Sequence, residues 1–143
     1  PRKMKRLLEM LKRHEGVKTH AYKDHLGYIT VGVGRCLDPE VGLGLSEDEI
    51  DHLLRGDIER CDAELRKEYP WFAGLDTVRQ DALTDLSFNV GQTRLRRFFK
   101  ALEAMKNGDY DLAAAEFLDS RWAEQVGNRS LEISEMIRTG TYP

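Results

Sequence analysis

Residues 15–34 read EGVKTHAYKDHLGYITVGVG, a sequence that predicts the end of a helix followed by a β-hairpin. The run 24–27, DHLG, has the composition of a tight turn, with Asp first and Gly last. Side chains in the following strand, residues 28–33, alternate between two faces, which separates Thr30 from its aliphatic neighbours. We expect the aliphatic face to be buried, with Thr30 facing outward near Asp24.

A helix is expected before the hairpin. Apolar residues recur at helical spacing at Met4, Leu7, Leu8 and Leu11. The pattern ends near His14, so Glu15 lies at the carboxyl end of the helix. Partial negative charge from the peptide dipoles there favours a raised pKa of the Glu15 carboxyl group. A general acid benefits from such a shift.

Glu15, Asp24 and Thr30 together carry the groups that hydrolysis of a sugar polymer requires. An inverting glycosidase uses one carboxylic acid to protonate the leaving oxygen and one carboxylate to activate water, roughly 6.5–9.5 Å apart. A hydroxyl beside the base can fix the orientation of that water. Taken singly, the three residues have ordinary explanations as a helix end, a turn former and a strand residue. Only their combination predicts a catalytic site.

The remainder of the chain is predicted to be helical. Ser46 and Glu49 form a capping box that begins a helix running to about Glu68, where Tyr69-Pro70 ends it. Asp76 can cap the next helix. Further helices are expected over 95–105, over 110–118 and from Asn128 to just before Gly140. Five or six helices and one small sheet make the predicted fold class α+β, predominantly helical.

The composition fits a single domain with a hydrophobic core. The chain has 143 residues, of which 41% are hydrophobic and 33% charged, and its net charge is −3. No run approaches the roughly 18–20 apolar residues that span a bilayer, so no stable membrane insertion is expected. The N-terminal segment is basic but lacks an uninterrupted apolar run, so no export signal is expected either.

The cysteines and histidines give weak signals. Cys36 and Cys61 fit a disulfide, two free thiols, or one buried and one exposed thiol. Synthesis in the cytoplasm favours free thiols. The four histidines have no metal-binding spacing, so no metal site is predicted.

The segment 94–100, RLRRFFK, interleaves basic and aromatic residues, a combination typical of nucleic-acid-binding surfaces. The two phenylalanines also fit the apolar face of a helix. The net charge of −3 opposes binding to a polyanion. We therefore expect no nucleic-acid partner.

The spacing of the candidate site residues matches a known pattern. Eight residues separate Glu15 from Asp24, five separate Asp24 from Thr30, and residues 27–34 follow Gly-Tyr-x-Thr-x-Gly-x-Gly. This pattern resembles the N-terminal signature of the phage-type, T4-like lysozymes and endolysins. Four later segments are similar to the C-terminal lobe of that family in the same order: 75–79, 88–91, 120–129 and 138–141. The resemblance covers nearly the whole chain.

The resemblance implies that residues 1–143 form one lysozyme-like domain with two lobes. A small hairpin lobe would span about 15–50. A larger helical lobe would span about 65–143 and include the N-terminal helix 2–14. The long helix between them would join the lobes.

The resemblance also implies an activity and roles for the three site residues. The reaction is cleavage of the β-1,4 bond between N-acetylmuramic acid and N-acetylglucosamine in peptidoglycan, with no metal and no cofactor. Glu15 would be the general acid, Asp24 the base or electrostatic partner, and Thr30 would position water.

Three further residues take roles through the same resemblance. Phe88 would line the sugar subsites, and Arg129 would form an ion pair with Glu15 that orients the acid. Arg35 stands where the family type has His and would lie at the substrate-binding edge of the small lobe. The alternatives for Phe88 and Arg129 are a core phenylalanine and a surface arginine.

The resulting hypothesis is a monomeric phage or prophage endolysin that binds peptidoglycan glycan strands. It would be made in the host bacterial cytoplasm and act on periplasmic peptidoglycan after release. The alternative is a non-catalytic peptidoglycan-binding or phage tail-associated module. Binding alone does not require Glu15, Asp24 and Thr30 together.

Overall fold

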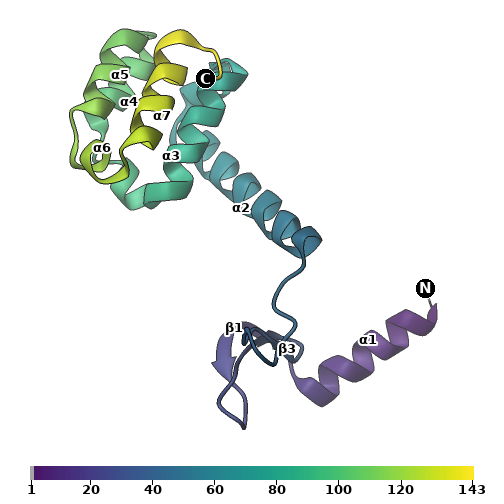
Figure 1. Ribbon diagram of the computed structural model, residues 1–143. Coiled ribbons are helices and arrows are strands. Elements are labelled where there is room, and N and C mark those ends of the chain that lie inside the picture. Colours follow the sequence, from purple (N-terminus) through teal and green to yellow (C-terminus); the bar gives the residue numbers. More distant parts are fainter. Residues whose placement is uncertain (1) are drawn as a thin grey trace. The chain divides into compact units, whose positions relative to one another are not determined.

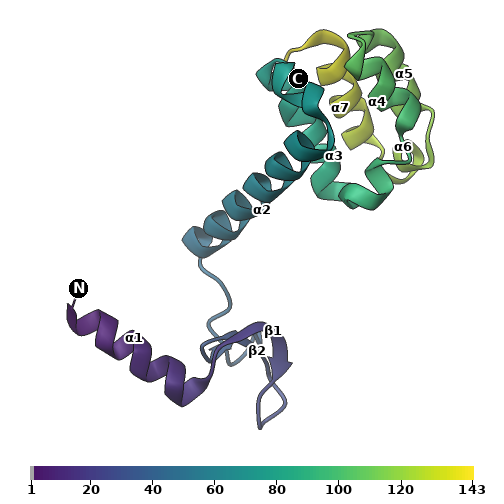
Figure 2. The same ribbon diagram turned by 180° about the vertical axis from the view of Figure 1, so that it is seen from behind.

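The structure, a computed structural model, describes residues 2–143 and is α+β and predominantly helical, as predicted. The chain divides into two compact units, one up to His52 and one from Leu53 onward. Figures 1 and 2 show the elements of both units from opposite sides.

The first unit contains a helix and a small sheet. Its elements are α1 (Arg2–Glu15), β1 (Lys18–Lys23), β2 (Ile29–Gly32) and β3 (Arg35–Cys36). The strands form one antiparallel sheet in the order β1-β2-β3. The predicted hairpin between β1 and β2 is confirmed, whereas β3 was not predicted.

The two chain reversals of this unit follow the local sequence. The Gly16 N–H donates to the Lys12 carbonyl at 2.9 Å, so α1 ends within one residue of the predicted position. In the turn, the Gly27 N–H donates to the Asp24 carbonyl at 2.9 Å. The predicted Asp-to-Gly turn is therefore confirmed.

The predicted orientation of β2 is wrong. Thr30 is 3% exposed, whereas Ile29 is 42% and Val33 38% exposed. Because β2 is the central strand, Thr30 is flanked by Tyr22 on β1 and Cys36 on β3. Its hydroxyl can be buried because it donates to the Tyr28 carbonyl at 3.0 Å.

The long helix α2 (Glu47–Glu68) begins with the predicted capping box. The Glu49 N–H donates to Ser46 Oγ at 3.2 Å, and the Ser46 N–H donates to Glu49 Oε1 at 2.9 Å. Both ends of the helix agree with the sequence prediction.

The second unit is a bundle of helices. After a 3-10 turn, η1 (Pro70–Gly74), it contains α3 (Thr77–Leu95), α4 (Phe99–Lys106), α5 (Tyr110–Leu118), α6 (Arg121–Val126) and α7 (Asn128–Thr139). Helix α7 lies between α3 and α5, and α4 packs against α5 (Figures 1 and 2). The buried hydrophobic side chains form a single cluster, whose members range in sequence from Leu65 to Ile137.

Most of the predicted helix boundaries in this unit are confirmed. Asp76 caps α3 by accepting from the Arg79 N–H, α5 spans 110–118, and α7 ends before Gly140. Helix α3 extends to Leu95 and α4 begins at Phe99, so the predicted helix over 95–105 begins four residues later than expected. The kink of α3 at Gly91 (φ 78°, ψ 164°), the turn η1 and the helix α6 were not predicted.

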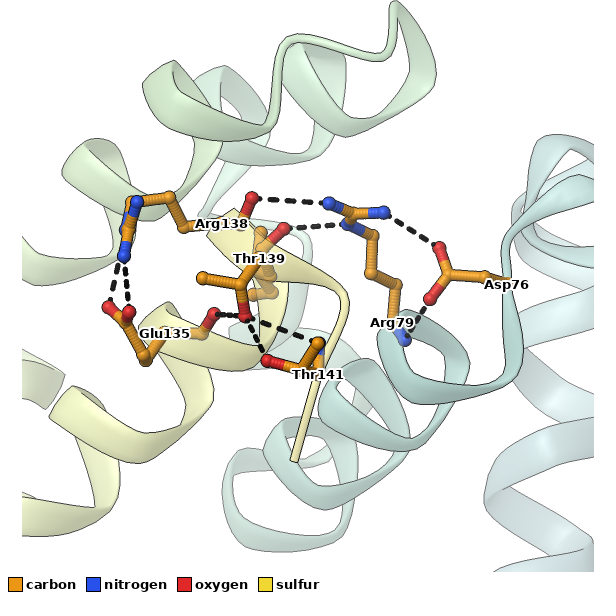
Figure 3. Close-up of polar contacts among 7 residues, drawn as sticks. Asp76, Arg79, Glu135, Arg138, Thr139 and Thr141 are labelled. Atoms are coloured by element: carbon orange, nitrogen blue, oxygen red, sulfur yellow. Dashed lines mark hydrogen bonds and ion pairs between the residues drawn. The ribbon is translucent and has the colours of Figure 1, made fainter. Parts of the chain in front are cut away.

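Hydrogen bonds of Arg79 connect the start of α3 with the end of α7 (Figure 3). Its guanidinium donates to the carbonyls of Ile137 at 2.6 Å and Arg138 at 3.2 Å, and to Asp76 Oδ1 at 2.9 Å. It also lies over the Tyr110 ring, 3.6 Å from the centroid. Arg79 thereby satisfies two carbonyls that a helix end leaves without a partner.

Within residues 2–143, no helix is both long enough and apolar enough to cross a membrane. Cys36 and Cys61 are free thiols. The assignment of helix 2–14 to the helical lobe stays a prediction.

Candidate active site

Glu15 is the last residue of α1, and its carboxyl group lies against the turn between β2 and β3. A Cβ atom placed on Gly34 would lie 2.8 Å from Glu15 Oε2 and 3.3 Å from Cδ. The side chain of Glu15 is exposed. The helix end and the second turn of the sheet are thus in contact through this carboxyl group.

Asp24 shapes the first turn of the sheet with one of its two carboxylate oxygens. Its Oδ1 accepts hydrogen bonds from the N–H groups of Leu26 and Tyr28, both at 2.9 Å. Within residues 2–143, Oδ2 makes no hydrogen bond. Asp24 is half-buried. One oxygen therefore fixes the carboxylate, while the other is free to accept a proton from water.

The backbone of Tyr28 connects Asp24 with Thr30. The Tyr28 N–H donates to Asp24 Oδ1, while the Tyr28 carbonyl accepts from the Asp24 N–H at 2.9 Å and from Thr30 Oγ1 at 3.0 Å. The proton of the Thr30 hydroxyl is committed to this carbonyl. Thr30 can therefore act toward a neighbouring water as a hydrogen-bond acceptor.

Arg35 joins the sheet to the start of α2. Its Nη1 donates to the Gly44 carbonyl at 3.0 Å and to Glu49 Oε1 at 2.8 Å. The hydrogen bond from Arg35, together with that from the Ser46 N–H, lowers the pKa of Glu49 to about 2. This pairing gives Arg35 a structural role, and its predicted contact with substrate stays a prediction.

Phe88 and Arg129 line the same pocket in the second unit. The pocket has a volume of ≈ 440 Å³, and its wall also includes Leu54, Ile58, Asp81, Thr84, Asp85 and Tyr142. Phe88 is 47% exposed, so it is not a core phenylalanine. Arg129 Nε donates to Asp85 Oδ1 at 2.8 Å. The predicted ion pair of Arg129 with Glu15 stays a prediction.

Several contributors to these sites were missed by sequence analysis. Gly34 and Asp85 act through contacts with residues far away in the sequence, Glu15 and Arg129, which no local pattern indicates. The Tyr28 backbone contacts are local, but the sequence analysis did not single them out. Trp122 belongs to the core of the helical unit: it is 3% exposed, and its Nε1 donates to Asn89 Oδ1 at 2.8 Å.

Comparisons with known proteins agree with this architecture. The model of the phage lysozyme family matches residues 12–136. Probable T4-type lysozyme 1 of Dictyostelium discoideum is 26% identical over 159 residues, which cover 93% of this chain and 94% of the relative. An endolysin of Acyrthosiphon pisum secondary endosymbiont phage 1 is 30% identical over 123 residues, or 86% of this chain and 82% of the relative.

A third relative is much longer than this chain. The pre-baseplate central spike protein Gp5 of Enterobacteria phage T4 is 26% identical over 159 residues, which cover 94% of this chain and 28% of the spike protein.

The fold and these matches define a glycoside hydrolase of the lysozyme class. The chain belongs to the phage lysozyme family. Its activity is that of a muramidase, which hydrolyses peptidoglycan.

Proposed function

We propose that Glu15, Asp24 and Thr30 form the catalytic site that cleaves the β-1,4 bond between N-acetylmuramic acid and N-acetylglucosamine. The observation that carries this proposal is the hydrogen-bond linkage of Asp24 and Thr30 through Tyr28, in the same unit as Glu15. Such a linkage holds a carboxylate and a hydroxyl in fixed relation, as water activation requires.

In the proposed reaction, Glu15 donates its proton to the glycosidic oxygen as the bond to the anomeric carbon breaks. Asp24 accepts a proton from the attacking water through Oδ2, because Oδ1 is occupied by two backbone N–H groups. Thr30 Oγ1 accepts a hydrogen bond from the same water and so orients the lone pair of the water oxygen toward the anomeric carbon. Attack from the face opposite the leaving oxygen inverts the anomeric configuration.

Asp24→Asn tests the proposed base without disturbing the turn. The amide oxygen of Asn can still accept the two backbone hydrogen bonds, but Asn cannot take up a proton. We expect the rate of peptidoglycan turbidity loss to fall by roughly 10²–10⁴-fold. The sugar product of the wild-type reaction should carry the inverted anomer, which proton NMR during turnover detects.

Asp38→Asn is the matched control. Asp38 Oδ1 also accepts two backbone N–H groups, from Glu40 at 2.9 Å and Val41 at 3.1 Å, but Asp38 has no proposed part in the reaction. Its variant should lyse peptidoglycan at the wild-type rate. Equal activity of the two variants would remove Asp24 from the mechanism.

We further propose that Phe88 lines the sugar subsites, that Arg129 forms an ion pair with Glu15 that orients the acid, and that Arg35 lies at the substrate-binding edge of the small lobe. The shared pocket of Phe88 and Arg129 supports the first of these assignments. Phe88→Ala should raise KM for glycan strands more than it lowers kcat. Unchanged KM in this variant would exclude Phe88 from the substrate site.

We propose that the chain acts as a monomeric endolysin, made in the host bacterial cytoplasm and acting on periplasmic peptidoglycan after release. The match to a phage endolysin supports this assignment. Cells of a Gram-negative host that express the chain should lyse only when the inner membrane is permeabilised. Lysis without permeabilisation would contradict the proposed need for release.

A second candidate is the lysozyme domain of a phage tail protein. The match to the T4 central spike protein, which covers 28% of that protein, favours it. Antibodies against this chain would then detect it in purified phage particles. Detection only in the free lysate would support the endolysin.

A further inference from the structure

Two glycines near the second turn of the sheet share one backbone conformation. Gly32 at the end of β2 and Gly34 in the following turn both have φ of +68°. This left-handed region disfavours any residue with a Cβ atom. Backbone conformation alone therefore makes alanine comparably unfavourable at the two positions.

The two glycines differ in what surrounds them. Apart from its two chain neighbours, a Cβ atom on Gly32 would meet no atom of the described residues within 4 Å. The three atoms nearest to a Cβ atom on Gly34 would all belong to the side chain of Glu15: Oε2 at 2.8 Å, Cδ at 3.3 Å and Cγ at 3.5 Å. The carboxyl group of the proposed general acid thus lies where a side chain at position 34 would begin.

We infer that Gly34 is a positioning residue for Glu15: its missing side chain lets the acid's carboxyl group lie directly against the turn between β2 and β3. This inference rests on the proposed role of Glu15 as the general acid. Gly34 touches the acid and not the reacting atoms.

The turn is less able to move than the glutamate side chain. The strands on either side of Gly34 pair through Thr30 with Cys36 and Val31 with Arg35. The Leu37 N–H also donates to the Ile29 carbonyl at 2.8 Å. Glu15, in contrast, is an exposed side chain with several rotatable bonds. A methyl group on Gly34 therefore displaces the Glu15 carboxyl group rather than the turn.

Displacement of an acid by about 1 Å can cost on the order of 100-fold in rate. The loss should fall on kcat, because proton donation is affected and glycan binding is not. The limb of the pH-rate profile that Glu15 sets should also move, since its carboxyl group enters different surroundings.

The experiment compares Gly34→Ala with Gly32→Ala. Both are assayed for kcat and KM on soluble, uncross-linked glycan strands over a range of pH, and for thermal unfolding. We expect similar decreases of Tm, with a loss of kcat on the order of 100-fold and a shifted pH limb in Gly34→Ala alone. Equal kcat and equal pH profiles in the two variants would overturn the inference.

A second pair keeps the test informative if the alanine variants fold poorly. Gly34→Asn and Gly32→Asn introduce a side chain that tolerates positive φ better than alanine does. The same difference in kcat is expected, and its absence overturns the inference.

Glu15→Gln, assayed alongside, distinguishes a failure of the positioning role of Gly34 from a failure of the proposed role of Glu15 as general acid. If Glu15→Gln is inactive while both glycine positions behave alike, the positioning role of Gly34 fails and the proposed acid stands. If Glu15→Gln remains active, the proposed function fails, and the inference falls with it.

Discussion

Each of the two units is stabilised internally by a different kind of interaction. In the unit from Leu53 onward, seventeen hydrophobic residues are buried, and they form one cluster. Among residues 4–52, only Thr30 is buried. The first unit depends instead on strand pairing, on the Asp24 turn, and on the contacts of Arg35 with Gly44 and Glu49.

This difference separates stability from chemistry. Burial of apolar surface is the dominant source of folding free energy, and the helical unit supplies it. The three proposed catalytic residues lie in the unit that hydrogen bonds hold in shape. Changes in the helical core should therefore affect unfolding most, and changes around the sheet should affect activity most.

The largest expected effect on stability is that of Phe117→Ala. Phe117 is fully buried, and its ring centroid lies 5.5 Å from that of Phe98. Its truncation should lower the free energy of unfolding by about 3–5 kcal/mol, measured by urea denaturation. Val31→Ala in the half-buried part of the sheet should cost clearly less. A larger loss in Val31→Ala would invalidate the comparison of the units.

Arg79→Met should have the next largest effect. Arg79 is 15% exposed and donates to Asp76 and to two carbonyls at the end of α7 (Figure 3). Loss of these hydrogen bonds should lower the free energy of unfolding by about 2 kcal/mol. The control is Arg138→Met: Arg138 is 50% exposed, is paired with Glu135, and should change stability by less than about 0.5 kcal/mol. A loss in Arg79→Met as small as that in Arg138→Met would show that the contacts of Arg79 between α3 and α7 contribute little to stability.

Two buried serines of α7 should respond in opposite directions. Ser134 is 3% exposed, and its Oγ has no hydrogen-bond partner among the residues that the structure describes, so Ser134→Ala should raise the free energy of unfolding by about 1 kcal/mol. Ser130 is also 3% exposed, but its Oγ donates to the Gly127 carbonyl at 2.6 Å. Ser130→Ala should lower stability by about 1 kcal/mol. Thermal unfolding of both variants measures the difference, and changes of the same sign would contradict it.

The smallest effect is expected for Arg35→Gln, and it depends on pH. The hydrogen bond from Arg35, together with that from the Ser46 N–H, lowers the pKa of Glu49 from 4.5 to about 2. A lowered pKa in the folded state stabilises the fold above about pH 4.5, and this contribution disappears as the pH falls toward 2. The wild type should therefore be more stable than Arg35→Gln at neutral pH, with the gap closing between pH 4.5 and 2.

The two side chains of this pair are 34% and 41% exposed, so salt should reduce the gap at neutral pH. Unfolding curves at several pH values and two salt concentrations test this. A gap that stays constant down to pH 2 would show that Glu49 is not its source.

Features of the fold that depend on neighbouring residues could be predicted from the sequence. The capping box of Ser46 and Glu49, the Asp76 cap and the turn at Asp24 are each complete within a few residues. Their chemistry is therefore visible in the sequence itself. The helical periodicity around them set most of the boundaries correctly.

Features that depend on distant residues could not be predicted. The burial of Thr30 follows from a third strand of only two residues, which is too short to give a periodic signal. The contacts of Arg79 with Ile137 and of Arg129 with Asp85 join residues 58 and 44 positions apart. The close approach of Glu15 to Gly34 likewise appears only once the helix end and the second turn are placed together.

The most direct test of the account compares Glu15→Gln with Glu9→Gln, two substitutions of glutamates on α1. The measurements are turbidity loss of purified Gram-negative peptidoglycan, release of muramic acid reducing ends, and Tm. We predict that Glu15→Gln loses roughly 10²–10⁴-fold in rate without a lower Tm, while Glu9→Gln matches the wild type. Lysis by Glu15→Gln at the wild-type rate, with the same reducing ends, would contradict the account.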